Sequence, residues 1–343
     1  ICEGLVGSEM CIRDRNGITF GGVGNGTEVD YIQVHNNEDD CVEMFGGTVN
    51  VKHLICTNSG DDGLDFDWGY QGKMQHVIVT QPDGTGDHIV ESDNTNANGD
   101  PAYNTEPITR PIVSNFTFIA SERDEAIKLK EGTDGRYYNG VIYSPDSSQE
   151  CFEIQDTVGS ARFNSVAMDC GGFVVGNMSG LVTAGSNNLY GANSGGGSYA
   201  STLNGVINGF NENNATVSNA LASDAFFDDV DYIGAVKDSS SAWYSGWTLE
   251  NSLNFPTFSN ESTFSADENQ TAIGSVTVNN DRGEGIVYSI TGSEITINST
   301  GVIAFSSAPD YETKNTYNAI VTANNGYYSS NQYITVNVTD LND

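Results

Sequence analysis

Basic residues are scarce in this chain, whose 343 residues include 13 Lys and Arg against 46 Asp and Glu, a formal net charge of −33. Such negative charge repels phosphate backbones and anionic lipid heads, which argues against binding to nucleic acids or membrane surfaces and suits divalent cations. No apolar run approaches the ~20 residues of a membrane span, so we expect no membrane insertion. Proline is also scarce, with 7 residues against 39 glycines, a composition that favours short strands and tight turns.

The first fifteen residues, Ile1–Arg15, are not typical of a folded segment or of a signal peptide. They lack a charged start, an apolar run and a small-residue cleavage site in that order. They resemble the translated adapter sequence that contaminates metagenomic gene sets from bacteria. We therefore treat residues 1–15 as non-native and expect that any export signal lay upstream.

A repeat of roughly two dozen residues runs through the first half of the chain, and such a period indicates a solenoid or array. In each copy an apolar residue is followed, three and five positions later, by two further apolar residues. The spacings between the copies are 22, 23, 39, 25 and 25, and the long one contains a polar insertion, Asp93–Asn104, that we expect to form a loop. The copies are Val29-Ile32-Val34, Val51-Leu54-Cys56, Met74-Val77-Val79, Val113-Phe116-Phe118, Tyr138-Val141-Tyr143 and Phe163-Val166-Met168.

A second alternating strand follows a polar turn in every copy except the last. Period two puts successive side chains on opposite faces. Short strands at this repeat length predict a parallel β-solenoid, because a leucine-rich repeat would need its Leu consensus and a β-sandwich would need hairpins. These strands are Val42-x-Met44, Leu64-x-Phe66, Ile89-x-Glu91, Ile127-x-Leu129 and Phe152-x-Ile154.

The repeat loosens after Cys170, and the aromatic segment Phe226–Trp247 is interpreted as a cap on the last coil. Gly46-Gly47-Thr48-Val49-Asn50, Gly60-Asp61-Asp62-Gly63 and Tyr232-Ile233-Gly234 resemble a group of secreted or lipid-anchored β-helix proteins of marine bacteria. That resemblance implies a right-handed parallel β-helix domain at 16–254 on the cell surface, with no agreed activity.

The remaining segment, 255–343, shows short alternating strands typical of a β-sandwich. Acidic motifs open, divide and close it: Ala266-Asp267-Glu268-Asn269, Asp310-Tyr311-Glu312 and Asp340-Leu341-Asn342-Asp343. In order and separation these motifs resemble those of a cadherin repeat. The fold class predicted for the whole chain is therefore all-β, a right-handed parallel β-helix followed by a cadherin-like Greek-key β-sandwich.

The cadherin resemblance implies a calcium site, because Ca²⁺ takes six to eight oxygen ligands. The site is half-built here, since in the family the next repeat supplies further ligands. Asn279-Asn280-Asp281 and Asn324-Asn325-Gly326 depart from the family pattern and argue against a second calcium cluster; ordinary solvated turns are the alternative. The implied ligands are Glu268, Asp310, Glu312, Asp340, Asn342 and Asp343.

Acidic residues recur at one turn of the solenoid, where neighbouring coils would lie ~4.8 Å apart. The alignment groups Asp40, Asp62, Asp87, Glu125 and Glu150. A calcium ion near Asp39, Asp40, Asp61 and Asp62 is one way to relieve their repulsion. Turns in which Asp caps a strand through side-chain-to-backbone hydrogen bonds are the alternative that we favour.

An enzyme is the competing class of function, since many parallel β-helix proteins are polysaccharide lyases or hydrolases. A lyase site could use a row of charged residues on the second strands, with Arg123 nearby, and a hydrolase needs two or three Asp on one face. No lyase or polygalacturonase signature surrounds any Arg or His, so we favour a non-enzyme. The lyase row is Glu43, Asp65, Lys128 and Glu153, and the hydrolase set is Asp61, Asp62, Asp65 and Asp67.

Histidines and cysteines form weaker patterns. His35, His53, His76 and His88 fall in successive coils, and His53 and His76 are expected to stack rather than bind zinc. Cys41, Cys56, Cys151 and Cys170 show no Cys-x-x-Cys spacing; Cys56 fits a core position, although an exported protein could pair two of the four.

The sequence thus predicts an extracellular or cell-surface calcium-binding protein for adhesion or recognition. Its solenoid would bind polysaccharide or another cell-surface protein, or serve homophilic adhesion, with the C-terminal module as a calcium-stiffened spacer. The alternative is a calcium-dependent polysaccharide lyase or glycoside hydrolase.

Overall fold

A computed structural model describes residues 15–82, 84–95, 102, 104–120, 125–155, 161–176, 185–249, 252–280 and 283–341. The chain forms two compact units, Ile1–Ala200 with Ala215–Thr248, and Ser201–Asn214 with Leu249–Asp343. The boundary expected between residues 254 and 255 differs from this division, because the second unit contains Ser201–Asn214 and resumes at Leu249. Within the described ranges, no helix has the length and apolar character needed to cross a membrane.

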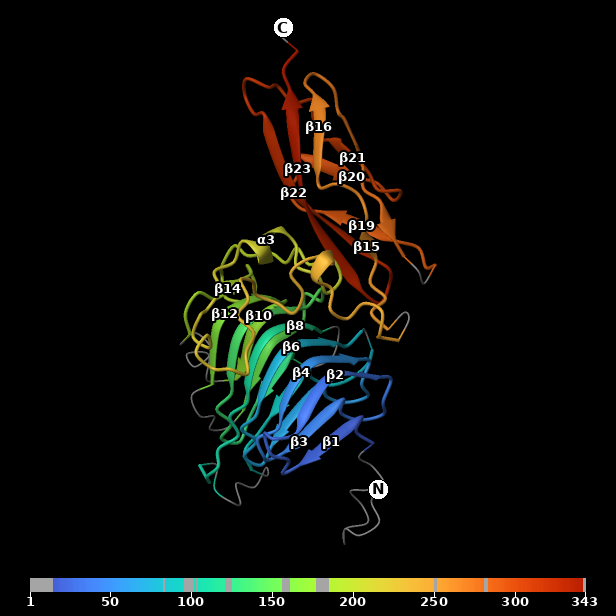
Figure 1. Cartoon of the computed structure of the whole chain (residues 1–343). Helices are drawn as coiled ribbons and strands as arrows, with labels where there is room; N and C mark the ends of the chain where they lie inside the picture. Colours follow the sequence, from blue (N-terminus) through green and yellow to red (C-terminus); the bar gives the residue numbers. More distant parts are fainter. Residues whose placement is uncertain are drawn as a thin grey trace. The chain divides into compact units, whose positions relative to one another are not determined.

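The first unit is a parallel β-solenoid, as predicted, in which the chain alternates between two seven-stranded sheets. Every strand pairs in parallel with the strand of the next coil, and the even-numbered strands form the stack that Figure 1 shows. Sheet A contains β1 (Ile18–Gly21), β3 (Val42–Phe45), β5 (Leu64–Asp67), β7 (Val90–Ser92), β9 (Ile127–Leu129), β11 (Glu150–Ile154) and β13 (Gly172–Gly176). Sheet B contains β2 (Glu28–His35), β4 (Asn50–Thr57), β6 (Lys73–Thr80), β8 (Ile112–Ile119), β10 (Arg136–Tyr143), β12 (Arg162–Asp169) and β14 (Leu189–Tyr190).

The solenoid core lies between the sheets and is filled by residues that repeat at the same place in successive coils. Leu64, Phe66 and Phe152 are completely buried, as period-two alternation requires. In β10 the residue next to Phe116 of β8 is a glycine, Gly140, because a Cβ at that position would lie 2.1 Å from the ring of Phe116. The small residue in one coil thus accommodates the large ring in the preceding coil.

Two disulfides cross this core, Cys41–Cys56 and Cys151–Cys170. All four sulfurs belong to buried residues. The interpretation of Cys56 as a plain core hydrophobe was therefore incomplete, since its burial accompanies a covalent bond.

A left-handed residue recurs at the fourth position of each eight-residue strand of sheet B. Such a conformation is unfavourable for a residue with a side chain, by roughly 1–2 kcal/mol. The left-handed residues are Tyr31, His53, His76, Asn115, Asn139 and Ser165, with φ between 48° and 60°. The rings of the first three stack on one another.

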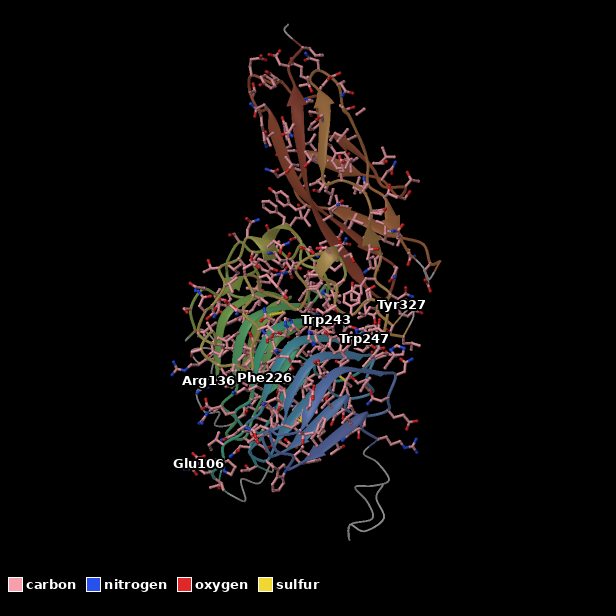
Figure 2. The ribbon with its side chains drawn as sticks, viewed as in Figure 1. Glu106, Arg136, Phe226, Trp243, Trp247 and Tyr327 are labelled. Atoms are coloured by element: carbon pink, nitrogen blue, oxygen red, sulfur yellow. A yellow bond between two sulfur atoms is a disulfide. The ribbon has the colours of Figure 1, made fainter. Side chains whose placement is uncertain are left out.

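The segment 215–248 lies across the outer face of sheet B. Asp228 accepts hydrogen bonds from Lys52 Nζ (2.7 Å), while the backbone carbonyl of Tyr232 accepts one from Asn115 (2.9 Å). Figure 2 shows Phe226, Trp243 and Trp247 over the strands of this sheet. The sequence analysis placed these aromatics on the edge of the last coil, and that placement was wrong because their partners are side chains of earlier coils.

The second unit is a β-sandwich, as predicted, apart from the short helix α3 (Phe210–Asn213). One sheet has the order β16-β23-β22-β19 and the other β17-β21-β20, and both contribute residues such as Val321 and Ile303 to one core. The strands of the sheets are β16 (Thr263–Asp267), β17 (Ala272–Ser275), β19 (Val287–Ile290), β20 (Ile295–Ile297), β21 (Val302–Phe305), β22 (Thr316–Asn324) and β23 (Ser329–Thr339). β15 (Thr257–Phe258) pairs with β18 (Val278–Asn279).

Candidate functional site on the outer face of sheet A

The outer face of sheet A carries a compact set of ionisable side chains. They occupy equivalent places in successive coils, because Glu43 pairs with Asp65, Asp65 with Glu91, Glu91 with Lys128 and Lys128 with Glu153. A parallel row follows two residues further along each strand. We call this set the sheet A face: Glu43, Asp65, Asp67, Glu91, Asp93, Lys128, Lys130 and Glu153.

The pKa values of two acidic residues of this face are raised. Burial raises the pKa of Asp67 to about 10, assisted by the charge of Asp93 and a hydrogen bond between the two carboxyl groups. Burial, followed by the charges of Asp67 and Asp40, raises the pKa of Asp65 well above its ordinary range. Asp65 and Asp67 are each only 8% exposed. Repulsion on this face is therefore relieved by protonation as well as by basic residues.

Lys128 and Lys130 supply positive charge in the fourth coil. Their Nζ atoms lie 3.2 and 3.0 Å from Oε1 of Glu91. Burial by itself raises the pKa of Glu91, but the two ammonium groups outweigh burial and lower it. The pKa of Glu91 is thus lowered while that of Asp67 is raised, so the pKa values of two carboxyl groups on one face are shifted in opposite directions.

His88 stands beside this face, at the position that follows Asp62 in the stack. Asp62 Oδ1 accepts the backbone N–H of His88 at 2.8 Å and lies 3.2 Å from its Nδ1. Asp40 Oδ1 accepts the backbone N–H of Asp62 at 3.0 Å. The acidic turn is therefore built from side-chain-to-backbone hydrogen bonds, which is the alternative that the sequence analysis favoured.

One register expected from the sequence was wrong. The alignment paired Ile89 with Leu64, whereas Val90 pairs with Leu64. His88, rather than Asp87, therefore follows Asp62, and Glu91 points outward into the charged row. The physical reason is that Ile89 and Val90 are both fully buried, so alternation of apolar residues does not fix the register there.

The lyase row expected from the sequence, Glu43, Asp65, Lys128 and Glu153, is brought together by the strand register. Arg123 lies outside the described residues. Of the hydrolase set, Asp65 and Asp67 are on the face, whereas Asp61 and Asp62 lie in the preceding turn. Glu91, Asp93 and Lys130 also belong to this face and were not expected there, because their places depend on the register of β7.

The expected calcium ligands of the second unit lie at one end of its sandwich. Glu268 is buried, and its two carboxylate oxygens accept the backbone N–H groups of Tyr311 (3.1 Å) and Leu341 (2.8 Å). One side chain thus ties the opening acidic motif to the middle and closing motifs. Asn342 and Asp343 lie outside the described residues.

Asp310 and Glu312, two of the other expected ligands, differ in the direction in which their pKa values are shifted. Asp310 accepts hydrogen bonds from Thr313 Oγ1 (2.9 Å) and from the backbone N–H of Glu312 (3.1 Å), and these bonds lower its pKa. A backbone hydrogen bond favours ionised Glu312, but slight desolvation and the charges of Glu268 and Asp340 raise its pKa overall. An all-oxygen donor set of mutually repelling carboxylates suits a hard cation such as Ca²⁺.

His53 and His76 on sheet B stack, as expected. The rings of His53 and His76 are 4.9 Å apart and nearly parallel, and Tyr31 extends the stack. Trp243 packs edge-on against His53, so these rings hold the segment 215–248 in place.

Comparison with known proteins gives one family match and several partial structural matches. A family model described as a pectate-lyase like beta helix domain matches residues 8–248. No curated protein sequence matches the chain.

Similar solved structures include cadherin fragments, each with a TM-score of 0.24. Human protocadherin-24 EC1-2 in form II is 22% identical, over 26% of this chain and 46% of that one. Drosophila N-cadherin EC1-3 is 22% identical, over 25% and 34%, and the human desmocollin-1 ectodomain is 25% identical, over 26% and 21%. The chain spans less than half the length of each of these structures, and at this TM-score the likeness carries no functional conclusion.

Proposed function

The chain belongs to the pectate-lyase-like β-helix family, and from this premise we propose that it is an extracellular or cell-surface protein that binds polysaccharide on the sheet A face. The second unit would serve as a calcium-stiffened module for adhesion or spacing. Binding to another cell-surface protein is the alternative for the same face.

The main support for this proposal is a set of carboxyl oxygens on the face that make no hydrogen bond. Asp65 Oδ1, Asp67 Oδ1 and Asp93 Oδ1 are buried and have no hydrogen-bond partner within the described residues. Buried polar atoms in folded proteins nearly always have a partner. Sugar hydroxyl groups both donate and accept hydrogen bonds, so a polysaccharide can satisfy ionised and protonated carboxyl groups alike.

Charge on the same face favours an extended ligand. The acidic row and the ammonium groups of Lys128 and Lys130 follow successive coils, which are spaced ~4.8 Å apart. A polymer that lies along the face would contact acidic residues such as Asp65 and Glu91 with some of its sugar units and Lys128 with a later one. A polysaccharide that carries occasional carboxylates matches that sequence of charges.

Export and calcium binding are parts of the same proposal. The two disulfides support an oxidising location, since such bonds persist outside the reducing cytosol. The convergence of Glu268, Glu312 and Asp340 supports Ca²⁺ at the end of the sandwich. There the ion would join this module to a following one.

Cleavage of the bound polysaccharide is a second candidate, favoured by the opposite directions in which the pKa values of Asp67 and Glu91 are shifted. Neighbouring groups whose pKa values are pushed apart can act as an acid and a base. Release of reducing ends, or of an ultraviolet-absorbing unsaturated product, would establish this candidate. Binding without either product would leave recognition as the function.

Affinity electrophoresis through gels that contain neutral or uronate-bearing polysaccharides tests the proposal. We expect at least one polysaccharide to retard the protein in the presence of chelator, and Asp65→Asn with Asp67→Asn to weaken the retardation at least tenfold. Glu28→Gln, on the exposed part of β2, is the matched control and should leave it unchanged. Retardation that survives the Asp65 and Asp67 substitutions would overturn the proposed site.

A further inference from the structure

We propose that His88, Glu125 and Glu153 form a binding site for a divalent transition metal, with Zn²⁺ as the best-matched ion. These residues come from three successive coils, immediately before β7, immediately before β9 and within β11. The inference goes beyond polysaccharide binding and does not depend on it, because metal binding can be measured without any saccharide.

The ligand atoms are already gathered. His88, Glu125 and Glu153 each offer one atom, and these atoms all lie within 4.8 Å of one another. His88 Nε2 is 4.0 Å from Glu153 Oε2. Zinc holds nitrogen and carboxylate oxygen at roughly 2.0–2.2 Å in a tetrahedral arrangement, so two of its ligand atoms lie about 3.4 Å apart. Small side-chain rotations therefore suffice to close the site.

The imidazole of His88 distinguishes this cluster from the all-carboxylate clusters Asp39-Asp40-Asp61, Asp40-Glu43-Asp65 and Asp61-Asp62-Asp87. Its side chain is completely buried. Among the described residues, none forms a hydrogen bond with Nε2. Nε2 lies 4.0 Å from Glu153 Oε2, and a ring nitrogen of His88 lies within 4.8 Å of a Glu125 carboxylate oxygen. A fully buried ring nitrogen without a hydrogen bond, beside partly buried carboxylates, is the arrangement expected of a metal-binding histidine.

Asp62 completes the arrangement from the other side of the ring. Its Oδ1 lies 3.2 Å from Nδ1 and also accepts the backbone N–H of His88. Histidines that bind metals usually donate their second ring N–H to a carboxylate or carbonyl, which fixes the ring and its tautomer. Asp62 therefore acts as a positioning residue that directs Nε2 toward the ion.

The donor set selects the kind of ion. Calcium prefers six to eight oxygen atoms, whereas one imidazole nitrogen with two carboxylates suits zinc and its neighbours. Three protein ligands leave a coordination position for water. Lys128 Nζ lies 3.8 Å from Glu153 Oε2 and 3.2 Å from Glu91 Oε1, so Glu91 can hold the ammonium group when Glu153 turns to the metal.

Calorimetric titration of the untagged, chelator-treated full chain with Zn²⁺ tests this site, followed by the same titration with Ca²⁺. We expect one Zn²⁺ per chain that Ca²⁺ does not displace. His88→Gln should abolish this binding, and Glu153→Gln and Asp62→Asn should weaken it at least tenfold. His35→Gln is the matched control, because His35 hydrogen-bonds Thr57 at the end of β2, and it should bind as the unaltered protein does.

Ring-nitrogen NMR on the unaltered protein keeps the proposal testable if His88→Gln does not fold. Addition of Zn²⁺ should shift Nε2 of His88 and leave the other three histidines unchanged. Absence of zinc binding, a shift at a different histidine, or full affinity in folded His88→Gln would each overturn the site. Loss of polysaccharide binding alone would not, since that result bears only on the proposed function.

Discussion

Asp62 Oδ1 accepts a hydrogen bond from the backbone N–H of His88 at 2.8 Å and lies 3.2 Å from its Nδ1, which joins two coils of the solenoid through one carboxylate. The same relationship occurs one coil earlier, where Asp40 accepts the N–H of Asp62. Buried carboxylates therefore serve as acceptors for the next coil, and their protonation is coupled to folding.

Asp40→Asn should stabilise the first unit at alkaline pH. Burial, followed by the charge of Asp62, raises the pKa of Asp40 to about 9. Because the folded pKa lies above the unfolded value, Asp40 favours folding below the unfolded pKa, and that contribution is lost as pH rises toward 9. At pH 8 the amide should add at least about 1.4 kcal/mol, the equivalent of one pKa unit.

Thermal melting at pH 4 and pH 8 measures the effect of Asp40→Asn. The gain in melting temperature should be larger at pH 8, since Asn keeps the oxygen that accepts the N–H of Asp62 but carries no charge. An equal gain at both pH values would mean that Asp40 is ionised in the folded protein.

Reduction of the disulfides should destabilise the first unit alone. Cys41–Cys56 and Cys151–Cys170 close loops of 15 and 19 residues, and Ser201–Asn214 and Leu249–Asp343 contain no cysteine. A loop of this length contributes about 3 kcal/mol. Scanning calorimetry with and without reductant should move one transition and leave the other in place; movement of both would contradict the assignment of separate units.

Gln75→Ala should release the segment 215–248 from sheet B. Gln75 Oε1 accepts the backbone N–H of Asp228 at 2.7 Å, and its Nε2 donates to the backbone carbonyl of Asp228 at 3.0 Å. Loss of both bonds should cost about 2 kcal/mol locally. Limited proteolysis should then cut within the segment, whereas the control Asp231→Asn, which breaks only the ion pair to Lys237, should not.

Glu268→Ala should lower the melting temperature of the second unit even without calcium. The substitution removes the acceptor for the N–H groups of Tyr311 and Leu341, at a cost of about 2 kcal/mol. Asp340→Asn, at an exposed position, should change calcium-free stability much less than Glu268→Ala does and should reduce the stabilisation by added Ca²⁺. Equal behaviour of the two variants without calcium would contradict the structural role of Glu268.

Much of the solenoid was predictable because one apolar period repeats in each coil, and Val51, Leu54 and Cys56 of β4 show the pattern that recurs in β2, β6 and β8. The charged row followed from the same period. The register of strand β7 was not predicted correctly, because the adjacent residues Ile89 and Val90 are both buried and alternation cannot show which of them pairs with Leu64.

Other features depend on contacts between distant residues. The place of Trp243 against His53 is set by packing across nearly two hundred positions, which local pattern does not encode. The left-handed residues of sheet B include Tyr31, whose residue type gives no sign of that conformation. The pairing of four cysteines likewise has three solutions until the coils are placed.

The proposed binding of polysaccharide to the sheet A face is tested most directly by lysine footprinting with an amine-reactive label and mass spectrometry. The chain offers matched probes: the side chains of Lys128 and Lys130 on sheet A are 18% and 20% exposed, and those of Lys52 and Lys73 on sheet B are 20% and 30% exposed. A retarding polysaccharide should protect Lys128 and Lys130 and leave Lys52 and Lys73 labelled as before. Protection of the sheet B lysines, or of none of the four, would contradict it.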